Sequence, residues 1–262
     1  MSVSAAFEKA SGRAVLVGYL PAGFPNVDGA IAAIRAMIES GVDIVEVGLP
    51  YSDPVMDGPV IQRAAEAALA GGVRVADVLR TVSAVTDAGA PVLVMSYWNP
   101  VEHYGVSAFA RDLANAGGAG LITPDLIPDE AAEWLAAADE HDLDRVFLVA
   151  PSSSDDRIRL TAGACRGFVY ASSVMGVTGA RAQTSSAAPA LVERVRRVAP
   201  DIPVAVGLGV RDGAQAAEVG SFADGVIVGS ALVSCLLDAT DLDAGLAAVR
   251  RLSAELAGGV RG

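Results

Sequence analysis

Two carboxylates occupy positions from which they could share acid and base chemistry. Glu46 lies inside the apolar run Asp43–Leu49, and Asp57 follows eleven residues later, on a loop interrupted by prolines. A carboxylate is rarely buried without a partner, and burial raises its pKa by disfavouring the charged form. If both groups face one cavity, their different environments can divide the acid and base roles. The alternative is that Glu46 pairs with an arginine and that Asp57 caps the helix starting near Pro59.

The rarity of other reactive side chains narrows the chemistry. Lys9 is the only lysine, and His103 and His141 are the only histidines. A Schiff-base lysine and a histidine-rich zinc site are therefore nearly excluded, and a Ser-His-Asp triad would need one of two isolated histidines. Cys165 and Cys235 lie far apart in the sequence and are expected to be buried small hydrophobes, not a disulfide. If the chain is an enzyme, carboxylates and tyrosine should carry the proton transfers.

The composition bounds the class of protein and its partners. The chain has 262 residues, of which 52% are hydrophobic, and a formal net charge of -12. This length suits one large core, and the negative charge argues against nucleic acid or an anionic membrane as partner. A phosphorylated small molecule is still compatible, because backbone N–H groups can bind phosphate locally. The N-terminus lacks a secretory pattern and no apolar run approaches about 20 residues, so we expect a cytoplasmic protein that does not cross a membrane.

Apolar runs alternate with amphipathic stretches along the chain. The runs are short, rich in valine and isoleucine and without polar alternation, which is typical of strands buried on both faces. They are Ala14–Leu20, Asp43–Leu49, Pro91–Tyr97, Ala119–Ile122, Arg145–Ala150, Gly167–Ala171, Ile202–Gly207 and Asp224–Val228. The amphipathic stretches predict helices over residues 3–12, Val27–Ser40, Gly58–Leu69, Ala76–Asp87, Ser107–Ala116, Asp129–Asp139, Ser154–Ala164, Pro189–Val198, Asp212–Val219, Ser230–Leu237 and Leu242–Leu256. Gly41, Gly117 and Gly220 stand where helix C-caps are expected.

This order of elements predicts an α/β fold with one domain over residues 1–262. Eight strands that are each followed by a helix form a closed (β/α)8 TIM barrel, here with an extra N-terminal helix. An open doubly wound sheet also alternates, but eight full units without G-x-G-x-x-G after the first strand favour the barrel. The active site of such a barrel lies at the C-terminal strand ends, where Glu46, Met95, Ile122 and Tyr170 are expected.

Glycine-bearing turns follow the last three predicted strands. Two of them, Gly207–Gly209 and Gly229-Ser230, come after strands seven and eight, where this fold usually grips a phosphate. Strand-ending glycines with no ligand are the alternative. The segment Ala171–Ala188 is long for a strand-to-helix connection and predicts a lid that excludes water, or else a merely disordered loop.

Five motifs in order resemble one known family. They are E-V-G-L-P-Y-S-D-P-V-M-D-G-P-V-I-Q from residue 46, P-D-L-I-P-D-E from 124, G-V-T-G-A-R from 176, V-G-L-G-V from 206 and V-G-S-A-L-V from 228. Together they resemble the tryptophan synthase alpha chain family over essentially the whole chain. The resemblance implies retro-aldol cleavage of indole-3-glycerol phosphate to indole and glyceraldehyde 3-phosphate, with no cofactor on this chain.

The resemblance also implies roles for single residues. Glu46 falls on the family's catalytic acid and base, and Asp57 on the carboxylate that holds the indole N–H. Tyr170 falls near the reacting hydroxyl, and Thr178 on the lid residue that reaches Asp57 on closure. The residues that fall on the phosphate grip are Gly179, Gly209, Gly229 and Ser230. By position, the indole pocket is expected to be lined by Met95, Ile122, Leu208 and Ile227, each of which could equally be a barrel-core residue.

A partner is implied as well. In the family this chain pairs with a pyridoxal-phosphate beta chain as an alpha2beta2 heterotetramer, and indole passes between the two chains. The loop Pro50–Pro59 and the segment after Asp125 would face that partner, with Asp53 either a contact or a turn-setting residue. Leu208, Ile127 and Tyr51 depart from the family's usual residues at their positions.

Three other functions fit less well. The synthase that makes indole-3-glycerol phosphate would need a strand lysine, and Lys9 is the only candidate. An isomerase of phosphoribosyl substrates would need two symmetric phosphate sites, and the glycine turns lie at one end only. The non-enzyme alternative is a phosphate-binding barrel that only activates a partner subunit, against which the presence of both Glu46 and Asp57 argues.

Overall fold

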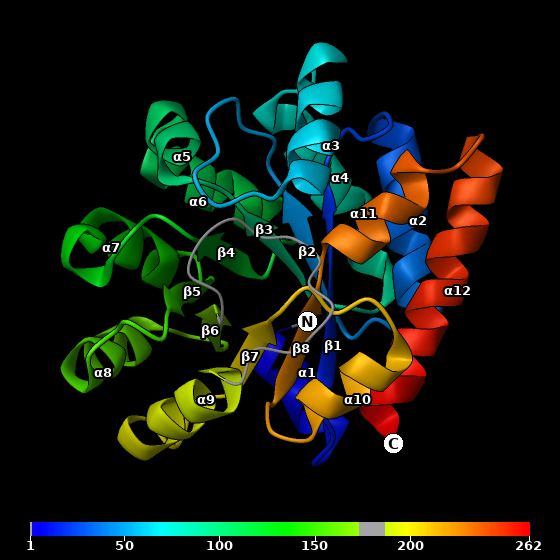
Figure 1. The fold of residues 1–262 in the computed structure, drawn as a ribbon. Helices are drawn as coiled ribbons and strands as arrows, with labels where there is room; N and C mark the ends of the chain where they lie inside the picture. Colours follow the sequence, from blue (N-terminus) through cyan, green and yellow to red (C-terminus); the bar gives the residue numbers. More distant parts are fainter. Residues whose placement is uncertain (1, 173–186) are drawn as a thin grey trace.

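Eight parallel strands form a closed barrel. A computed structural model describes residues 2–172 and 187–262. The strands are β1 (Val15–Pro21), β2 (Ile44–Gly48), β3 (Val92–Met95), β4 (Gly120–Thr123), β5 (Asp144–Val149), β6 (Val169–Ser172), β7 (Val204–Gly207) and β8 (Gly225–Val228). Each strand pairs with the next and β8 pairs with β1, so the ring has no open edge (Figure 1). The predicted TIM barrel is confirmed. The first and last residues of each strand differ by at most two positions from the ends of its predicted run.

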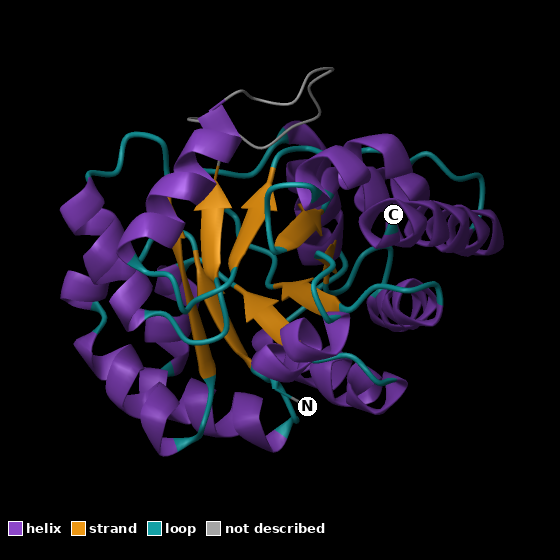
Figure 2. Cartoon of the chain, turned by 90° about the horizontal axis from the view of Figure 1, so that it is seen from below, coloured by secondary structure: helices purple, strands orange, loops and turns teal. Residues whose placement is uncertain are grey.

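Helices surround this ring (Figure 2). They are α1 (Val3–Ala10), α2 (Val27–Glu39), α3 (Pro59–Ala70), α4 (Val75–Val85), α5 (Trp98–Tyr104), α6 (Val106–Asn115), α7 (Ala132–Glu140), α8 (Asp155–Ala164), α9 (Ala187–Val198), α10 (Gly213–Gly220), α11 (Ser230–Leu237) and α12 (Leu242–Arg261), with short 3-10 turns at Thr86–Ala88 and Pro128–Glu130. Within residues 2–172 and 187–262, none of these helices has the length and apolarity needed to cross a bilayer.

The structure differs from the helix predictions at α5 and at the end of α12. Helix α5 was not predicted, and β3 ends at Met95, so Tyr97 caps α5 instead of ending the strand. Helix α12 continues past Leu256, through two consecutive glycines, to Arg261. A Cβ on Gly259 would lie 2.1 Å from the carbonyl oxygen of Gly213, so glycine here permits close packing of α12 on α10.

Two of the three glycines predicted to be helix C-caps, Gly41 and Gly117, are confirmed at helix C-termini. Gly41 and Gly117 adopt left-handed backbone angles, with φ of 107° and 81°, just beyond the ends of α2 and α6. Gly220 instead lies inside the last turn of α10, and Ser221 caps that helix with a φ of -70°. Its hydrogen faces the Ala14 side chain, where a Cβ would stand 3.3 Å away, so close packing explains this glycine.

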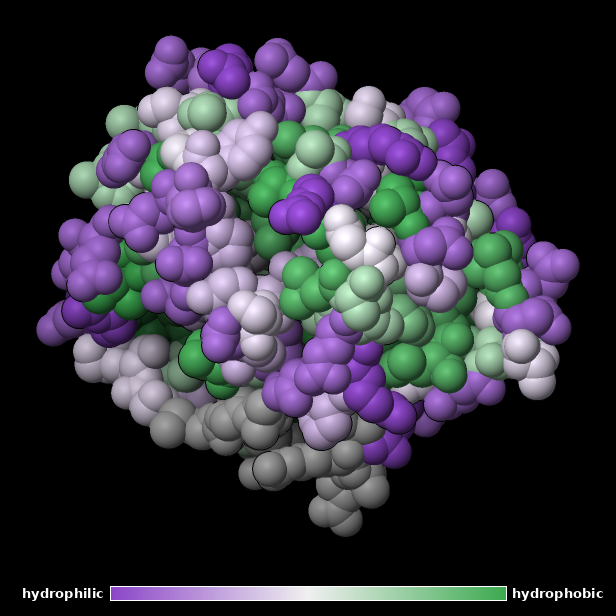
Figure 3. Space-filling view, turned by 90° about the horizontal axis from the view of Figure 1, so that it is seen from above, coloured by the Kyte–Doolittle hydropathy of each residue, from purple (hydrophilic) through white to green (hydrophobic). Residues whose placement is uncertain are grey.

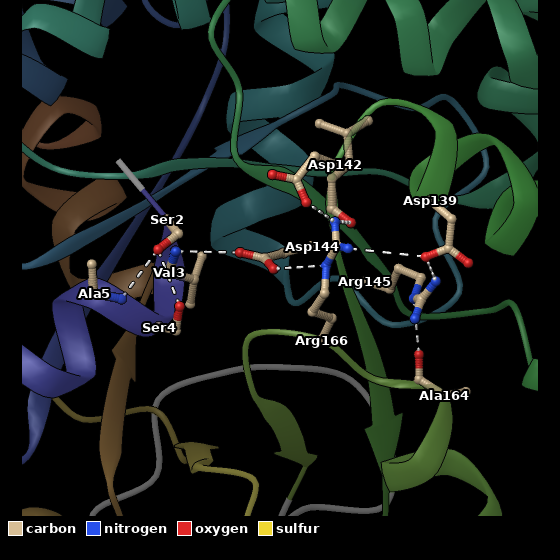
Figure 4. A network of polar contacts seen from close by, with 11 residues as sticks. Ser2, Val3, Ser4, Ala5, Asp139, Asp142, Asp144, Arg145, Ala164 and Arg166 are labelled. Carbon is tan, nitrogen blue, oxygen red and sulfur yellow. Dashed lines mark hydrogen bonds and ion pairs between the residues drawn. The ribbon is translucent and has the colours of Figure 1, made fainter.

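Helix α1 closes the end of the barrel at which the strands begin. Phe7 packs against Phe168, which precedes β6, with ring centroids 6.0 Å apart. The Val3 N–H donates to the Asp144 carboxylate at 3.2 Å, and Arg166 lies 3.3 Å from the same carboxylate (Figure 4). The opposite end, where the strands finish, is the end available for a ligand.

The outer surface mixes hydrophilic and apolar side chains. Figure 3 shows a face on which hydrophilic groups surround several smaller apolar areas. Among the described residues, the large hydrophobic side chains that are clearly exposed are Val55, Tyr104, Ile127, Leu160 and Leu242. Single exposed apolar residues are ordinary, but Val55 and Ile127 lie in the two segments predicted to face a partner.

Candidate active site

Glu46 points into the barrel as a buried carboxyl group. Side chains alternate along a strand, and Ile44 belongs to the cluster that fills the barrel interior, so Glu46 shares that inward face. Only 1% of its surface is exposed, and its Oε1 has no hydrogen-bond partner within the described part of the chain. Burial raises the pKa of Glu46 to about 8. No ion pair between described residues involves Glu46, so the arginine-paired alternative finds no support there.

Asp57 lies on the loop after β2 and is held by a tyrosine. Its Oδ1 accepts a hydrogen bond from the Tyr97 hydroxyl at 3.1 Å, and its backbone oxygen accepts one from Gln62 at 2.8 Å. Burial raises the pKa of Asp57, and the Tyr97 hydrogen bond opposes part of that rise. The cap position of α3 belongs to Gly58 instead of Asp57, so the capping alternative is wrong. Asp57 is therefore a half-buried carboxyl group aimed by its neighbours.

Tyr170 brings a phenol close to both carboxylates. It lies on β6, and its hydroxyl rests against Gly207, where a Cβ would stand only 2.6 Å from the oxygen. Burial raises the pKa of Tyr170, and the charges of Glu46 and Asp57 raise it further. The phenol therefore keeps its proton and can donate a hydrogen bond. The structure thus brings together the three residues predicted to be catalytic.

Tyr19 is a site residue that sequence reasoning missed. It lies on β1 directly opposite Glu46 in the strand register. Its hydroxyl occupies the space above Gly48, where a Cβ would be 2.2 Å away. Burial raises the pKa of Tyr19 well above 10, and the charges of Asp57 and Glu46 add to this rise. Tyr19 stands two positions after Val17, so both side chains point to the same face of β1, and this spacing could have placed Tyr19 in the barrel interior.

The predicted phosphate residues lie at the ends of β7 and β8. Gly209 adopts a φ of 73°, which a residue with a side chain rarely does, so its turn requires glycine. Gly229 caps the N-terminus of α11, and Ser230 is the first residue of that helix. A Cβ on Gly229 would lie 3.3 Å from the Tyr19 ring, so this helix end adjoins the interior tyrosine. Gly179 and Thr178 lie outside the described residues.

The four residues predicted to line an indole pocket do not all belong to one cluster. Ile122 and Ile227 are buried in the barrel interior, and Met95 packs against the same cluster, as does Tyr170. Leu208 is buried instead within the larger cluster that joins the barrel to its helices. Apolar side chains from β3, β4 and β8 therefore belong to the same interior cluster against which Tyr170 packs.

Two features bear on other predicted roles. The exposed Asp53 carboxylate accepts a hydrogen bond from the neighbouring Ser52 hydroxyl at 2.5 Å, which favours neither a turn-setting role nor a partner contact. Asp125 accepts the Trp98 N–H at 2.9 Å and so caps α5. Within residues 2–172 and 187–262, His, Cys, Asp and Glu side chains form no group of three or more suited to a metal ion.

Comparison with known proteins identifies the family of the chain. The family model described as tryptophan synthase alpha chain matches residues 6–259. The chain belongs to the tryptophan synthase alpha chain family. Members of this family catalyse cleavage of indole-3-glycerol phosphate, and the chain is accordingly a carbon–carbon lyase of tryptophan biosynthesis.

Individual relatives are similar over almost their whole length. The tryptophan synthase alpha chain of Salinispora arenicola is 69% identical over 261 residues, which cover 99% of this chain and 97% of that protein. The alpha chain of Mycobacterium tuberculosis is 63% identical over 253 residues, covering 97% and 91%. A solved structure of Mycobacterium tuberculosis tryptophan synthase superposes with a TM-score of 0.93 at 61% identity, covering 99% of this chain and 98% of that one.

Proposed function

We propose that Glu46 is the general acid and base of the retro-aldol cleavage and that Asp57 stabilises the charged indole intermediate. The observation that carries this proposal is the state of Glu46, a buried carboxyl group with a pKa of about 8 and with one oxygen that has no hydrogen-bond partner among residues 2–172 and 187–262. Such a group is largely protonated at neutral pH and can give its proton to carbon. Burial also raises the pKa of the second carboxylate, Asp57, but it is less buried than Glu46 and the Tyr97 hydrogen bond favours its charged form.

The reaction moves one proton within the substrate. Glu46 donates a proton to C3 of the indole ring, and the ring nitrogen takes the positive charge, which the Asp57 carboxylate stabilises through the N–H. The hydroxyl on the adjacent side-chain carbon then loses its proton to the Glu46 carboxylate. The carbon–carbon bond breaks as a carbonyl forms, and its electron pair returns to the ring to neutralise the nitrogen. No oxidant, metal or imine is needed, because the protonated ring is itself the electron sink.

Tyr170 orients the hydroxyl that reacts. Its phenol stays protonated, as argued above, and it lies close enough to feel the charges of both carboxylates. A protonated phenol can donate to the side-chain hydroxyl of the substrate while Glu46 accepts the proton of that hydroxyl. Tyr170 therefore contributes orientation, and Glu46 carries the proton.

The phosphate and the indole ring are assigned to different sets of residues around this centre. We assign the phosphate to the backbone of Gly209 and Gly229 and to the N-terminus of α11 with the Ser230 hydroxyl, a combination that suits an anion. Gly179 and the lid residue Thr178 retain these roles by resemblance to the family. We assign the indole pocket to Met95, Ile122, Leu208 and Ile227, of which three border the barrel interior.

The chain functions with a beta chain and needs no cofactor of its own. The solved Mycobacterium tuberculosis structures carry the name tryptophan synthase, and in this family the alpha chain joins a pyridoxal-phosphate beta chain as alpha2beta2. The exposed Val55 and Ile127 support the loop 50–59 and the segment after Asp125 as the partner-facing surface. Asp53 is proposed as a contact there, and the cytoplasm as the compartment.

One assay tests the proposal. Indole release from indole-3-glycerol phosphate is measured for the wild-type chain, for Glu46→Gln and for a matched surface control, Glu66→Gln, with and without the beta chain. Loss of the acid should lower kcat by about a hundredfold or more, and the exposed Glu66 should have no effect. Equal rates for wild type and Glu46→Gln would remove Glu46 from the mechanism. A wild-type chain that releases no indole but still activates a beta chain would instead favour the non-catalytic alternative.

A further inference from the structure

Tyr97 makes two hydrogen bonds to one loop. It follows β3 as the cap residue of α5, and only 5% of its surface is exposed. Its hydroxyl accepts the Met56 N–H at 3.0 Å and donates to Asp57 Oδ1 at 3.1 Å. A single phenol therefore fixes both the backbone before Asp57 and the carboxylate itself.

The ring of Tyr97 holds the other end of the same loop. It packs against Tyr51 with ring centroids 5.4 Å apart and the planes inclined by 36°. Between these two attachments the loop turns outward, and Val55 is 72% exposed. Tyr97 therefore contacts the loop on both sides of its exposed part and also holds the Asp57 carboxylate.

The environment of Tyr97 and Asp57 keeps the Tyr97 hydroxyl protonated, so that it remains a hydrogen-bond donor. Burial raises the pKa of Tyr97, and the charge of Asp57 raises it further, so the phenol keeps its proton. In return its hydrogen bond opposes the effect of burial on the pKa of Asp57 and favours the carboxylate. The bond thus sustains the charge that a cationic indole intermediate requires.

We propose that Tyr97 is a positioning residue that aims the Asp57 carboxylate at the indole N–H and links it to the partner-facing loop 51–57. The bond to Oδ1 sets the plane of the carboxylate, and Oδ2 is the acceptor we assign to the indole N–H. This inference rests on the proposed role of Asp57. It adds a route by which binding of the beta chain to the loop alters the geometry of the acidic site.

The test compares Tyr97→Phe with wild type and with Tyr104→Phe. The control removes a similar bond, from the Tyr104 hydroxyl to Asp112 at 2.8 Å, on the outside of the barrel. We expect Tyr97→Phe to lower kcat/KM by about tenfold or more, as for loss of a hydrogen bond to a charged group. The acidic limb of its pH profile should move to higher pH, and activation by the beta chain should shrink. Tyr104→Phe should leave all three unchanged.

A second variant separates positioning from packing. Asp57→Asn removes the negative charge that Tyr97 is proposed to position. Adding Tyr97→Phe to Asp57→Asn should therefore lower activity little further. Effects that multiply independently would show that the two residues act separately, and an unshifted pH profile in Tyr97→Phe would reduce Tyr97 to a packing role. If Glu46→Gln is inactive while Tyr97→Phe matches wild type, only this inference fails. If Glu46→Gln matches wild type, the proposed function itself fails.

Discussion

Replacing Glu46 by glutamine should stabilise the folded chain while it abolishes catalysis. The buried carboxyl group has a pKa of about 8 instead of the usual 4.5, because burial disfavours its charged form. A folded state that holds its proton more tightly than the unfolded state loses stability as pH rises between the two pKa values. Glutamine has a similar shape and does not titrate, so its variant should escape this loss.

The size of the effect follows from the two pKa values. The quantity to compare is the difference in the free energy of unfolding between Glu46→Gln and wild type. One pKa unit corresponds to about 1.4 kcal/mol, so this gap should grow by about that amount for each pH unit between 4.5 and 8. The gap should be absent below pH 4.5, reach about 3 kcal/mol at pH 7 and level off near 5 kcal/mol above pH 8. Because Glu46 is only 1% exposed, solvent should screen little of this cost.

Urea denaturation of wild type, Glu46→Gln and the surface control Glu66→Gln at several pH values measures this gap. As the pH rises, the free energies of unfolding of wild type and Glu66→Gln should decrease in parallel, and that of Glu46→Gln should decrease less. A gap between Glu46→Gln and wild type that does not change from pH 5 to pH 8 would refute the reasoning, since it would mean that Glu46 does not hold a proton in the folded state.

Glycine substitutions give three further predictions. Gly207→Ala places a Cβ 2.6 Å from the Tyr170 hydroxyl, so indole release should fall sharply; unchanged kcat would show that Tyr170 is not needed where it lies. Gly163 lies on an exposed turn of α8, where an added Cβ would meet no atom of the other described residues within 4 Å, so Gly163→Ala should raise the free energy of unfolding by about 0.5–1 kcal/mol and leave activity intact. Gly259→Ala would meet the Gly213 backbone at 2.1 Å and should lower the melting temperature, and a neutral result would contradict the close packing of α12 on α10.

The strands were readable from the sequence because a barrel strand is buried on both faces. Its run of valine and isoleucine needs no tertiary information to be recognised. Helix α5 was hidden by Pro100, which stands in its first turn, where proline is tolerated because the backbone N–H has no helical partner. The end of α12 was misplaced because Gly259 looks like a stop, although its contact with α10 makes it part of the helix.

The site was partly readable in the same way. Glu46 was conspicuous as a carboxylate in an apolar run, and Gly209 as a glycine in a tight turn. Tyr19 was not, because an aromatic residue in a strand resembles core packing, and Tyr97 was predicted only to end its strand at the active-site end, with no role. Their importance depends on which residues the barrel brings opposite them, Glu46 in one case and Asp57 in the other. Such neighbours are fixed by strand register and loop contacts, which local sequence does not specify.

The most direct test of the paired carboxylates is the pH dependence of kcat/KM for indole release by the wild-type chain with its beta chain. A protonated Glu46 and an ionised Asp57 predict a bell-shaped profile whose basic limb falls near pH 8 and whose acidic limb lies above the usual aspartate range. A rate that stays constant well above pH 8 would contradict the account, because the proton given to the indole ring would then not come from Glu46.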